Sequence, residues 1–234
     1  MEYVGIELNG LPGSGKTTLL NNLNPQIKKY FNSEKEFYSC LNNPLGRFYS
    51  LKFCFAGNIC ADIKLLFNIQ KHAIAGRKIF ALQKTLKLLR FKGIFNQKRC
   101  SHLLSEGYLQ IVAEILDFLA IENLTKDSYF YKYVIEDIIT LNKLYFILIK
   151  VPVSVALNRV ANRNLLSNTI DSMHEEERKL FLLKRFSNND SLQKLVLNKI
   201  PLNRVLVIDG EDSVEKKVIQ LSEFLVTIIR NGKE

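Results

Sequence analysis

Near the start of the chain, three glycines precede a lysine and a threonine at fixed spacing. Phosphate oxygens are bound by successive backbone N–H groups, and glycines leave that backbone open to them. In the pattern Gly-x-x-x-x-Gly-Lys-Thr, the lysine reaches the terminal phosphates of a nucleotide and the threonine hydroxyl coordinates Mg²⁺. The spacing therefore predicts a Walker A loop for ATP–Mg²⁺, with Thr17 as a metal ligand. The candidate cofactor-binding residues are Gly10, Pro12, Gly13, Ser14, Gly15, Lys16, Thr17 and Thr18.

The residues on either side of this loop predict the setting that the loop needs. Tyr3–Leu8 is apolar and rich in β-forming residues, and a second apolar run begins at Leu19. A strand, a glycine-rich loop and a helix in this order place the N-terminal end of the helix at the phosphates. The helix dipole and the unpaired N–H groups of the first turn then add to anion binding.

Phosphoryl transfer also needs a carboxylate near the metal or near the attacking hydroxyl. Asp62 and Glu106 are the only acids in residues 38–112. Glu106 follows the candidate strand Cys100–Ser105, and Gly107 beside it allows a close backbone approach. We expect Glu106 to hold Mg²⁺-bound water or to act as general base, with helix capping or a salt bridge as the structural alternative. Asp62 is expected to be a surface charge or a partner of a nearby lysine.

Two arginines are candidates for the transferring phosphoryl group. Arg159 and Arg163 are four residues apart, so they share one face of a helix. Like charges at this spacing repel each other unless an anion lies between them, and guanidinium groups bind phosphoryl oxygens in pairs. We expect both to close over the triphosphate, and Lys184 and Arg185 are candidates to extend this clamp. The alternative is an exposed basic helix paired with Glu175–Glu177.

The net charge of +10 is unevenly placed, because residues 64–99 hold basic side chains and no acid. Such a stretch attracts an anionic partner, or it forms a solvated helix face. An apolar side is predicted from Ile79, Leu82, Leu86 and Leu89. A phosphorylated small acceptor and an anionic membrane surface both fit this pattern. Nucleic acid is disfavoured, since the aromatic residues are scattered without a stacking platform.

Five β-prone segments separated by helix-like segments organise the chain. They are Tyr3–Leu8, Glu36–Leu41, Cys100–Ser105, Leu144–Val151 and Val205–Asp209. The fourth is almost continuously apolar, as expected for a strand covered on both faces. This alternation predicts an α/β fold with a central parallel five-stranded sheet flanked by helices. No repeat, low-complexity tract or linker divides residues 1–234, so a single domain is expected.

Composition excludes several classes of protein. The hydrophobic content of 47% is too high for a disordered chain. No apolar run approaches the roughly 20 residues of a membrane-spanning helix. Glu2 and Asn9 interrupt the first apolar segment, so a secretory signal is not expected. The four cysteines form no CxxC pair, which disfavours zinc binding. We expect a reduced, cytoplasmic protein, with peripheral membrane contact as the remaining option.

Other phosphate-loop classes lack their second signature. A GTPase carries Asn-Lys-x-Asp, but residues 142–145 read Asn-Lys-Leu-Tyr. The Leu-Ser-Gly-Gly-Gln segment of ABC-type ATPases is absent. The glycine spacing also differs from that of dinucleotide-binding folds.

The sequence resembles the small P-loop kinases, in particular the thymidylate kinase-like and nucleoside kinase-like branch. Four segments carry the resemblance: Leu11–Thr18, Leu103–Gly107, Val151–Arg163 and Val205–Gly210. The first resembles the kinase form of the loop, with proline before the second glycine. The second resembles the acidic end of a strand beside the loop, and the third resembles the helix that leads to an arginine-bearing lid. The fourth resembles the turn beside adenine, which implies a cofactor-binding role for Gly210.

The sequence departs from the thymidylate kinase pattern at two places. Those kinases carry an Arg-Glu-Pro-Gly-like turn after the second strand and Asp-Arg-Tyr-like residues after the third. Here the corresponding segments are Asn42–Gly46 and Glu106–Tyr108. Thymidine monophosphate is therefore not expected as the substrate.

The resemblance implies a three-layer P-loop fold and an ATP–Mg²⁺-dependent kinase that phosphorylates a small nucleoside, nucleotide or sugar-type acceptor, anionic or hydroxyl-bearing. Lys16, Glu106, Arg159 and Arg163 would be catalytic, and Thr17 and Glu106 would hold the metal. A helical region at about residues 45–98 would bind the acceptor, and a lid would span about 159–185. Two alternatives stay open: a kinase for a membrane- or glycan-linked carbohydrate, and a non-enzymatic ATP-gated binding protein. The acceptor's identity and the oligomeric state are also open, with a homodimer as one option.

Overall fold

A parallel sheet forms the centre of the computed structural model, which describes residues 3–32, 59–97, 101–119, 129–162 and 173–231. Its strands are β1 (Gly5–Asn9), β2 (His102–Leu104), β3 (Leu144–Lys150) and β4 (Val205–Asp209). They lie in the order β2-β1-β3-β4. Because β1 lies between β2 and β3, the loop that leaves its carboxyl end lies at the edge of the sheet where α/β folds bind ligands.

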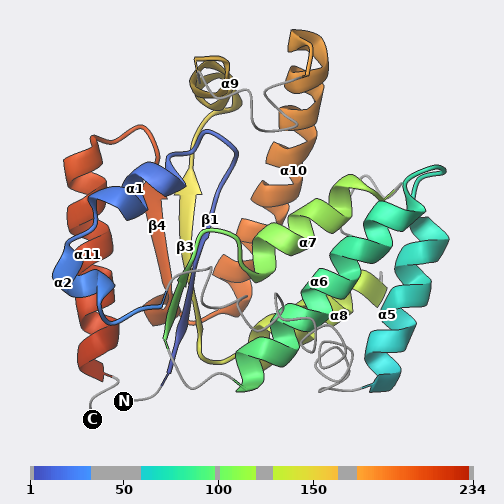
Figure 1. Cartoon of the computed structure of the whole chain (residues 1–234), viewed down its shortest axis with the longest axis horizontal. Coiled ribbons are helices and arrows are strands. Elements are labelled where there is room, and N and C mark those ends of the chain that lie inside the picture. Colours follow the sequence, from blue (N-terminus) through green and yellow to red (C-terminus); the bar gives the residue numbers. More distant parts are fainter. Residues whose placement is uncertain (1–2, 33–58, 98–100, 120–128, 163–172, 232–234) are drawn as a thin grey trace, which may run out of the picture.

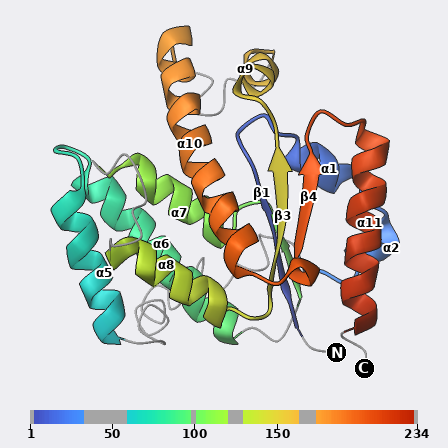
Figure 2. The ribbon, with the colours of Figure 1, turned by 180° about the vertical axis from the view of Figure 1, so that it is seen from behind.

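Helices cover both faces of the sheet and give three layers (Figures 1 and 2). On one face lie α1 (Lys16–Asn22), α2 (Pro25–Lys28) and α11 (Val214–Asn231). On the other side lie α7 (Tyr108–Asp117), α8 (Tyr129–Thr140) and α10 (Glu175–Lys199). The outer helices α5 (Ile59–His72) and α6 (Lys78–Gln97) pack against α8 and α7. A short helix, α9 (Val153–Ala161), follows β3, and a 3₁₀ turn, η2 (Leu202–Arg204), precedes β4.

The continuous apolar run of β3 is explained by its burial on both faces, as predicted. Ile147 and Ile149 pack into the core under α1 and α11. Phe146 and Leu148 pack into the larger core formed with α7, α8 and α10. Alternating side chains of one strand therefore belong to two different cores, and hydrophobic burial holds both helical layers against the sheet.

The expected fifth strand is not part of the described sheet, which has four strands. The segment predicted to form it, Glu36–Leu41, lies outside the described residues. Immediately before it, Asn32 pairs in parallel with His102 of β2. The Asn32 N–H donates to the Ser101 carbonyl at 2.8 Å, and the Leu103 N–H donates to the Asn32 carbonyl at 3.2 Å. The described chain thus reaches the outer edge of β2 just before that segment.

The predicted apolar face of α6 is wrong. Ile79 is 70% exposed and Leu82 is also exposed, whereas Ala81, Thr85 and Leu88 are fully buried. The helix packs against α5 and α7 together, so its contacts are set by two neighbours and not by one apolar stripe. None of the helices in the described ranges is long and apolar enough to cross a membrane.

Asp62 is not a surface charge, because its side chain is buried among α5, α6 and α8. The Tyr133 hydroxyl donates to its carboxylate, and the Lys92 ammonium lies 3.4 Å from the same oxygen. Lys92 also pairs with Asp137 at 2.8 Å, and the Tyr108 hydroxyl donates to Asp137 at 3.0 Å. Burial raises the pKa of Asp137. One lysine of the basic stretch thus stabilises two buried acids, which are costly without a partner.

Candidate functional site

The loop after β1 has the open backbone that the glycine spacing predicts. Gly13 and Gly15 adopt φ values of +84° and +93°, in the left-handed region that favours glycine. A Cβ atom on Gly13 would lie 2.8 Å from the Ala156 carbonyl oxygen of α9. A Cβ atom on Gly10 would lie 2.9 Å from the Ile149 carbonyl oxygen of β3. The glycines are therefore required both by the turn and by the close approach of β3 and α9.

Lys16 is the first residue of α1, and its side chain folds back over the loop. Its ammonium group donates to the Gly10 carbonyl at 2.6 Å and to the Leu11 carbonyl at 3.2 Å. The positive charge thus lies over the loop backbone, where the start of a helix already favours anions. This is the position from which a lysine reaches the phosphates of a nucleotide.

Thr17 and Thr18 are exposed on the first turn of α1, directly after the loop. Among the described residues, no three acidic, histidine or cysteine side chains lie close enough to hold a metal ion by themselves. Mg²⁺ commonly binds through one or two protein oxygens together with substrate phosphates and water. The exposed Thr17 hydroxyl fits a magnesium ion that is carried by a nucleotide.

A pocket of about 320 Å³ opens beside the loop, on the face of the sheet that α1 and α11 cover. Its lining residues are Gly13, Gly15, Thr18, Leu19, Arg159, Val214 and Lys217. The Arg159 guanidinium donates to the Gly210 carbonyl at 3.0 Å and lies 3.5 Å from the Gly13 carbonyl. Two of the predicted site residues, Arg159 and Gly210, are thus brought to the phosphate loop. Gly210 fits tightly, since a Cβ atom there would lie 2.1 Å from Val151.

Lys217 is a second cation of this pocket that the sequence analysis did not identify. Its ammonium group donates to the Gly210 carbonyl at 3.0 Å, so two cations converge on one carbonyl oxygen. Burial, and then the charge of Arg159, lower the pKa of Lys217. An anion bound between these cations would relieve their repulsion. In the sequence Lys217 is one of several lysines on an amphipathic helix, so no local signal distinguishes it.

The predicted acid Glu106 lies in the turn between β2 and α7 and is about half exposed. Its carboxylate forms an ion pair with Lys87 of α6 at 3.1 Å. The geometry therefore directs Glu106 toward the basic stretch. The other predicted lid arginine, Arg163, lies outside the described residues.

A different acid, Glu7 in β1, lies beside the loop lysine and was missed by sequence reasoning. Glu7 is fully buried, and its two carboxylate oxygens accept hydrogen bonds from the backbone N–H groups of Leu109 at 3.0 Å and Gln110 at 2.9 Å. Burial raises the pKa of Glu7 to about 7, while the backbone hydrogen bonds and the charge of Lys16 act in the opposite direction. A Cβ atom at Gly107 would lie 2.5 Å from the Glu7 carboxyl carbon. The close approach that Gly107 permits is thus to Glu7, which ties β1 to the start of α7.

Arg185 does not extend the anion clamp. It is buried and forms an ion pair with Asp117 at the end of α7, and Asn188 donates to the same carboxylate at 3.0 Å. Lys184 donates to the Asp117 backbone carbonyl at 2.8 Å. Both cations therefore fasten α10 to α7.

Comparison with known proteins identifies the fold. No protein-family model and no curated protein sequence matches the chain. Among solved structures, the chain is similar to a deoxyadenosine kinase from M. mycoides that was determined with bound dATP. The TM-score is 0.50 at 18% sequence identity, and the match covers 94% of this chain and 98% of the kinase chain. The chain has the fold of the P-loop nucleoside kinases.

Proposed function

We propose that this protein is an ATP-dependent kinase that phosphorylates a hydroxyl group of a nucleoside-class acceptor. The observation that carries the proposal is the phosphate loop, with Lys16 over its backbone and a pocket beside it that contains Arg159 and Lys217. This combination of open amides and three cations, with no acid among the pocket-lining residues, suits a nucleoside triphosphate.

Each of these residues has a distinct task in the proposed reaction. The loop amides and Lys16 bind the β- and γ-phosphates, so Lys16 exchanges its carbonyl partners for phosphate oxygens when ATP binds. Arg159 is close enough to the loop to bind the moving phosphoryl group, whose charge increases in the transition state. Magnesium, held by Thr17 and the nucleotide, would neutralise phosphate charge.

The transfer itself moves one phosphoryl group and one proton. The acceptor hydroxyl oxygen forms a bond to the γ-phosphorus as the bond to the β–γ bridging oxygen breaks, and ADP leaves with that electron pair. The hydroxyl proton passes to a carboxylate. We assign this role, or the binding of metal-coordinated water, to Glu106, which must exchange its Lys87 partner to fulfil it. Glu7 is held by backbone N–H groups of α7 and serves to position that helix.

The nucleoside class of acceptor is supported by the deoxyadenosine kinase with which the chain shares its fold. A membrane-linked acceptor receives less support from the basic stretch than the sequence suggests. Lys84 pairs with Glu114 at 2.6 Å, Lys87 pairs with Glu106, and Lys92 is largely buried with two acids. These lysines are neutralised within the fold and contribute little to a charged membrane-binding surface.

The proposal is tested by ADP release from ATP–Mg²⁺ in the presence of nucleosides, nucleoside monophosphates and sugars, with the product identified by intact mass. We expect release to depend on one nucleoside class. Lys16→Ala should lower turnover by at least about 10²-fold, because an interaction with the transferring phosphoryl group is lost. Lys179→Ala, at an exposed position of α10, is the matched control and should turn over like the wild type.

Two results would count against the kinase assignment. Undiminished turnover by Lys16→Ala, with circular dichroism that shows a folded protein, would refute the role of the phosphate loop. Tight ATP binding without transfer to any acceptor in the screen would favour the non-enzymatic, ATP-gated alternative.

A further inference from the structure

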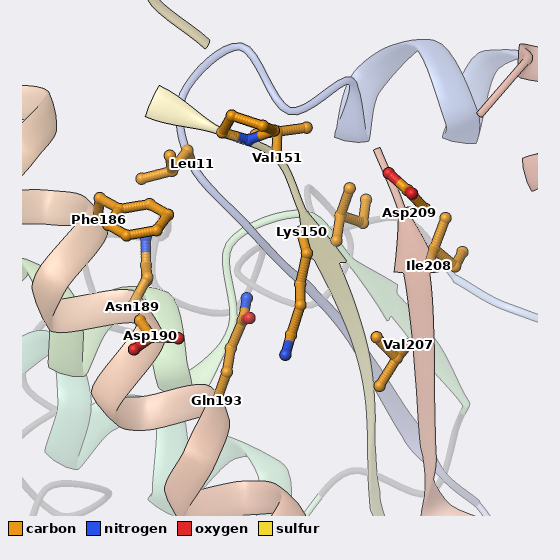
Figure 3. A pocket seen from close by; sticks show the side chains of 12 residues that line it. Leu11, Lys150, Val151, Phe186, Asn189, Asp190, Gln193, Val207, Ile208 and Asp209 are labelled. Carbon is orange, nitrogen blue, oxygen red and sulfur yellow. The ribbon is translucent and has the colours of Figure 1, made fainter. Parts of the chain in front are cut away.

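A second and larger cavity, of about 510 Å³, lies between α10 and the sheet (Figure 3). We call it the α10 cavity. Its floor is formed by side chains of β3 and β4, including Lys150 and Val207, and its wall by Phe186, Asn189 and Gln193 of α10. Both strands end here, so the cavity lies at the carboxyl edge of the sheet, where α/β folds bind ligands.

The α10 cavity is separate from the pocket that contains Arg159. Side chains alternate along β3, so Lys150 shares the α10 face with Leu148, whereas Ile147 and Ile149 contribute to the core under α1 and α11. The Arg159 pocket is lined from α1, α9 and α11. The phosphate loop adjoins both, because its residue Leu11 lines the α10 cavity.

One polar side chain of the cavity wall is buried without a partner. Asn189 is 3% exposed, and neither its amide nitrogen nor its amide oxygen has a hydrogen-bond partner in the described part of the chain. Leaving a buried polar group unpaired costs about 1–3 kcal/mol, and such groups are rare enough to require an explanation. The neighbouring Gln193 differs, since its Nε2 donates to Asn9 Oδ1 at 3.1 Å.

The remaining lining determines what kind of molecule would satisfy Asn189. Leu11, Val151, Val207 and Ile208 give apolar surface, and the Phe186 ring stands beside Asn189 at the cavity mouth (Figure 3). Apolar walls with a few fixed polar groups are typical of small-molecule sites. A carboxamide offers a donor and an acceptor side by side, and it pairs in two-point fashion with a base edge, as asparagine does with adenine. An aromatic ring next to it provides a stacking surface.

We infer that the α10 cavity is a binding site for the base of a nucleoside, with Asn189 as the residue that recognises its hydrogen-bonding edge. The inference goes beyond the proposed ATP site and does not depend on it. The same chemistry is offered by a nucleoside that becomes phosphorylated and by one that binds without reacting, and the experiments below separate these two sources.

The first experiment measures binding of adenosine, guanosine, cytidine and thymidine to the full chain by calorimetry, without ATP. We expect at least one to bind, and Asn189→Ala to weaken its binding about tenfold or more. Asn198→Ala, an exposed position on the same helix, should bind like the wild type. Since Asn189 has no partner to lose, the melting temperature of Asn189→Ala should equal or exceed that of the wild type. Failure of all four nucleosides to bind, or unchanged binding by Asn189→Ala, would overturn the inference.

The second experiment locates the bound nucleoside. The chain contains no tryptophan, so Phe186→Trp introduces a single reporter at the cavity. Saturable quenching of its emission by the nucleoside that binds is expected, whereas Phe67→Trp, 73% exposed on α5, should not respond. Calorimetric binding with a response from the control reporter alone would place the ligand elsewhere and overturn the inference.

The third experiment assigns the source of the ligand. If the bound nucleoside gains a phosphoryl group when ATP–Mg²⁺ is added, the α10 cavity holds the acceptor. If it is recovered unchanged while another acceptor is phosphorylated, the cavity holds a non-reacting nucleoside; both results support a base site there. Lys16→Ala should retain nucleoside binding, so a failure of the kinase proposal would leave this binding intact and would be distinguished from a failure of the base site.

Discussion

The buried carboxyl group of Glu7 is predicted to make the protein less stable as the pH rises through neutrality. Its pKa is about 7 in the folded protein and 4.5 in its ordinary, exposed state. The folded state therefore binds a proton more tightly than the unfolded state does. The stabilisation from this proton is complete below about pH 4.5 and is lost as the pH rises through about 7.

The size of the effect follows from the two pKa values. One pKa unit corresponds to about 1.4 kcal/mol, so the difference between 4.5 and about 7 is worth roughly 3 kcal/mol of unfolding free energy. Glu7→Gln removes the titration while it keeps the size of the side chain. The amide retains only one acceptor oxygen for the two N–H groups of α7 that Glu7 binds, which costs about 1 kcal/mol at every pH.

The assay is urea unfolding followed by far-UV circular dichroism between pH 4.5 and 8.5. Relative to Glu7→Gln, the wild type should lose roughly 3 kcal/mol across this range. Asp117 and Asp137, whose pKa values are raised by burial, titrate in both proteins and cancel in the difference. Glu136→Gln, at an exposed position of α8, is the control and should follow the wild type. A difference between wild type and Glu7→Gln that does not change with pH would show that the backbone hydrogen bonds keep Glu7 ionised, and would refute the reasoning.

Two further substitutions test the contacts of the site and its support. Arg159→Ala should lower kcat by about 10²-fold or more with a smaller change in the Kd for ATP, measured by steady-state kinetics and calorimetry, because its proposed contact strengthens in the transition state; a change in Kd alone would make it a ground-state binder. Arg185→Leu should lower the urea-unfolding free energy by about 3 kcal/mol, since the Asp117 carboxylate is left buried without its cation, and an unchanged midpoint would contradict this.

Much of the site could be predicted because the phosphate loop is local in the sequence. The glycines, Lys16 and the threonines are contiguous, and the required backbone is set by residue type alone. Gly13 and Gly15 adopt the positive φ values that this interpretation needs. The strands Leu144–Lys150 and Val205–Asp209 were equally readable, since unbroken apolar runs are typical of strands covered on both faces.

The helical region was harder to predict because its residues are chosen by neighbours that are distant in the chain. Ile79 and Leu82 have the spacing of a buried face, yet they are exposed because α6 packs between α5 and α7. Asp62 has the sequence context of a surface charge, but Lys92 and Tyr133, from two other helices, bury it. Helical periodicity does not reveal which side of a helix receives partners when several helices surround it.

The sequence by itself determined that the chain has a phosphate-binding loop within an alternating α/β arrangement, because both depend on neighbouring residues. Only the tertiary structure decided which other groups surround that loop. Arg159 and Lys217 meet at the Gly210 carbonyl, and Glu7 lies beneath the start of α7, because strands distant in sequence end at the same edge of the sheet. Convergence of this kind results from packing of the two cores, and no short segment of sequence encodes it.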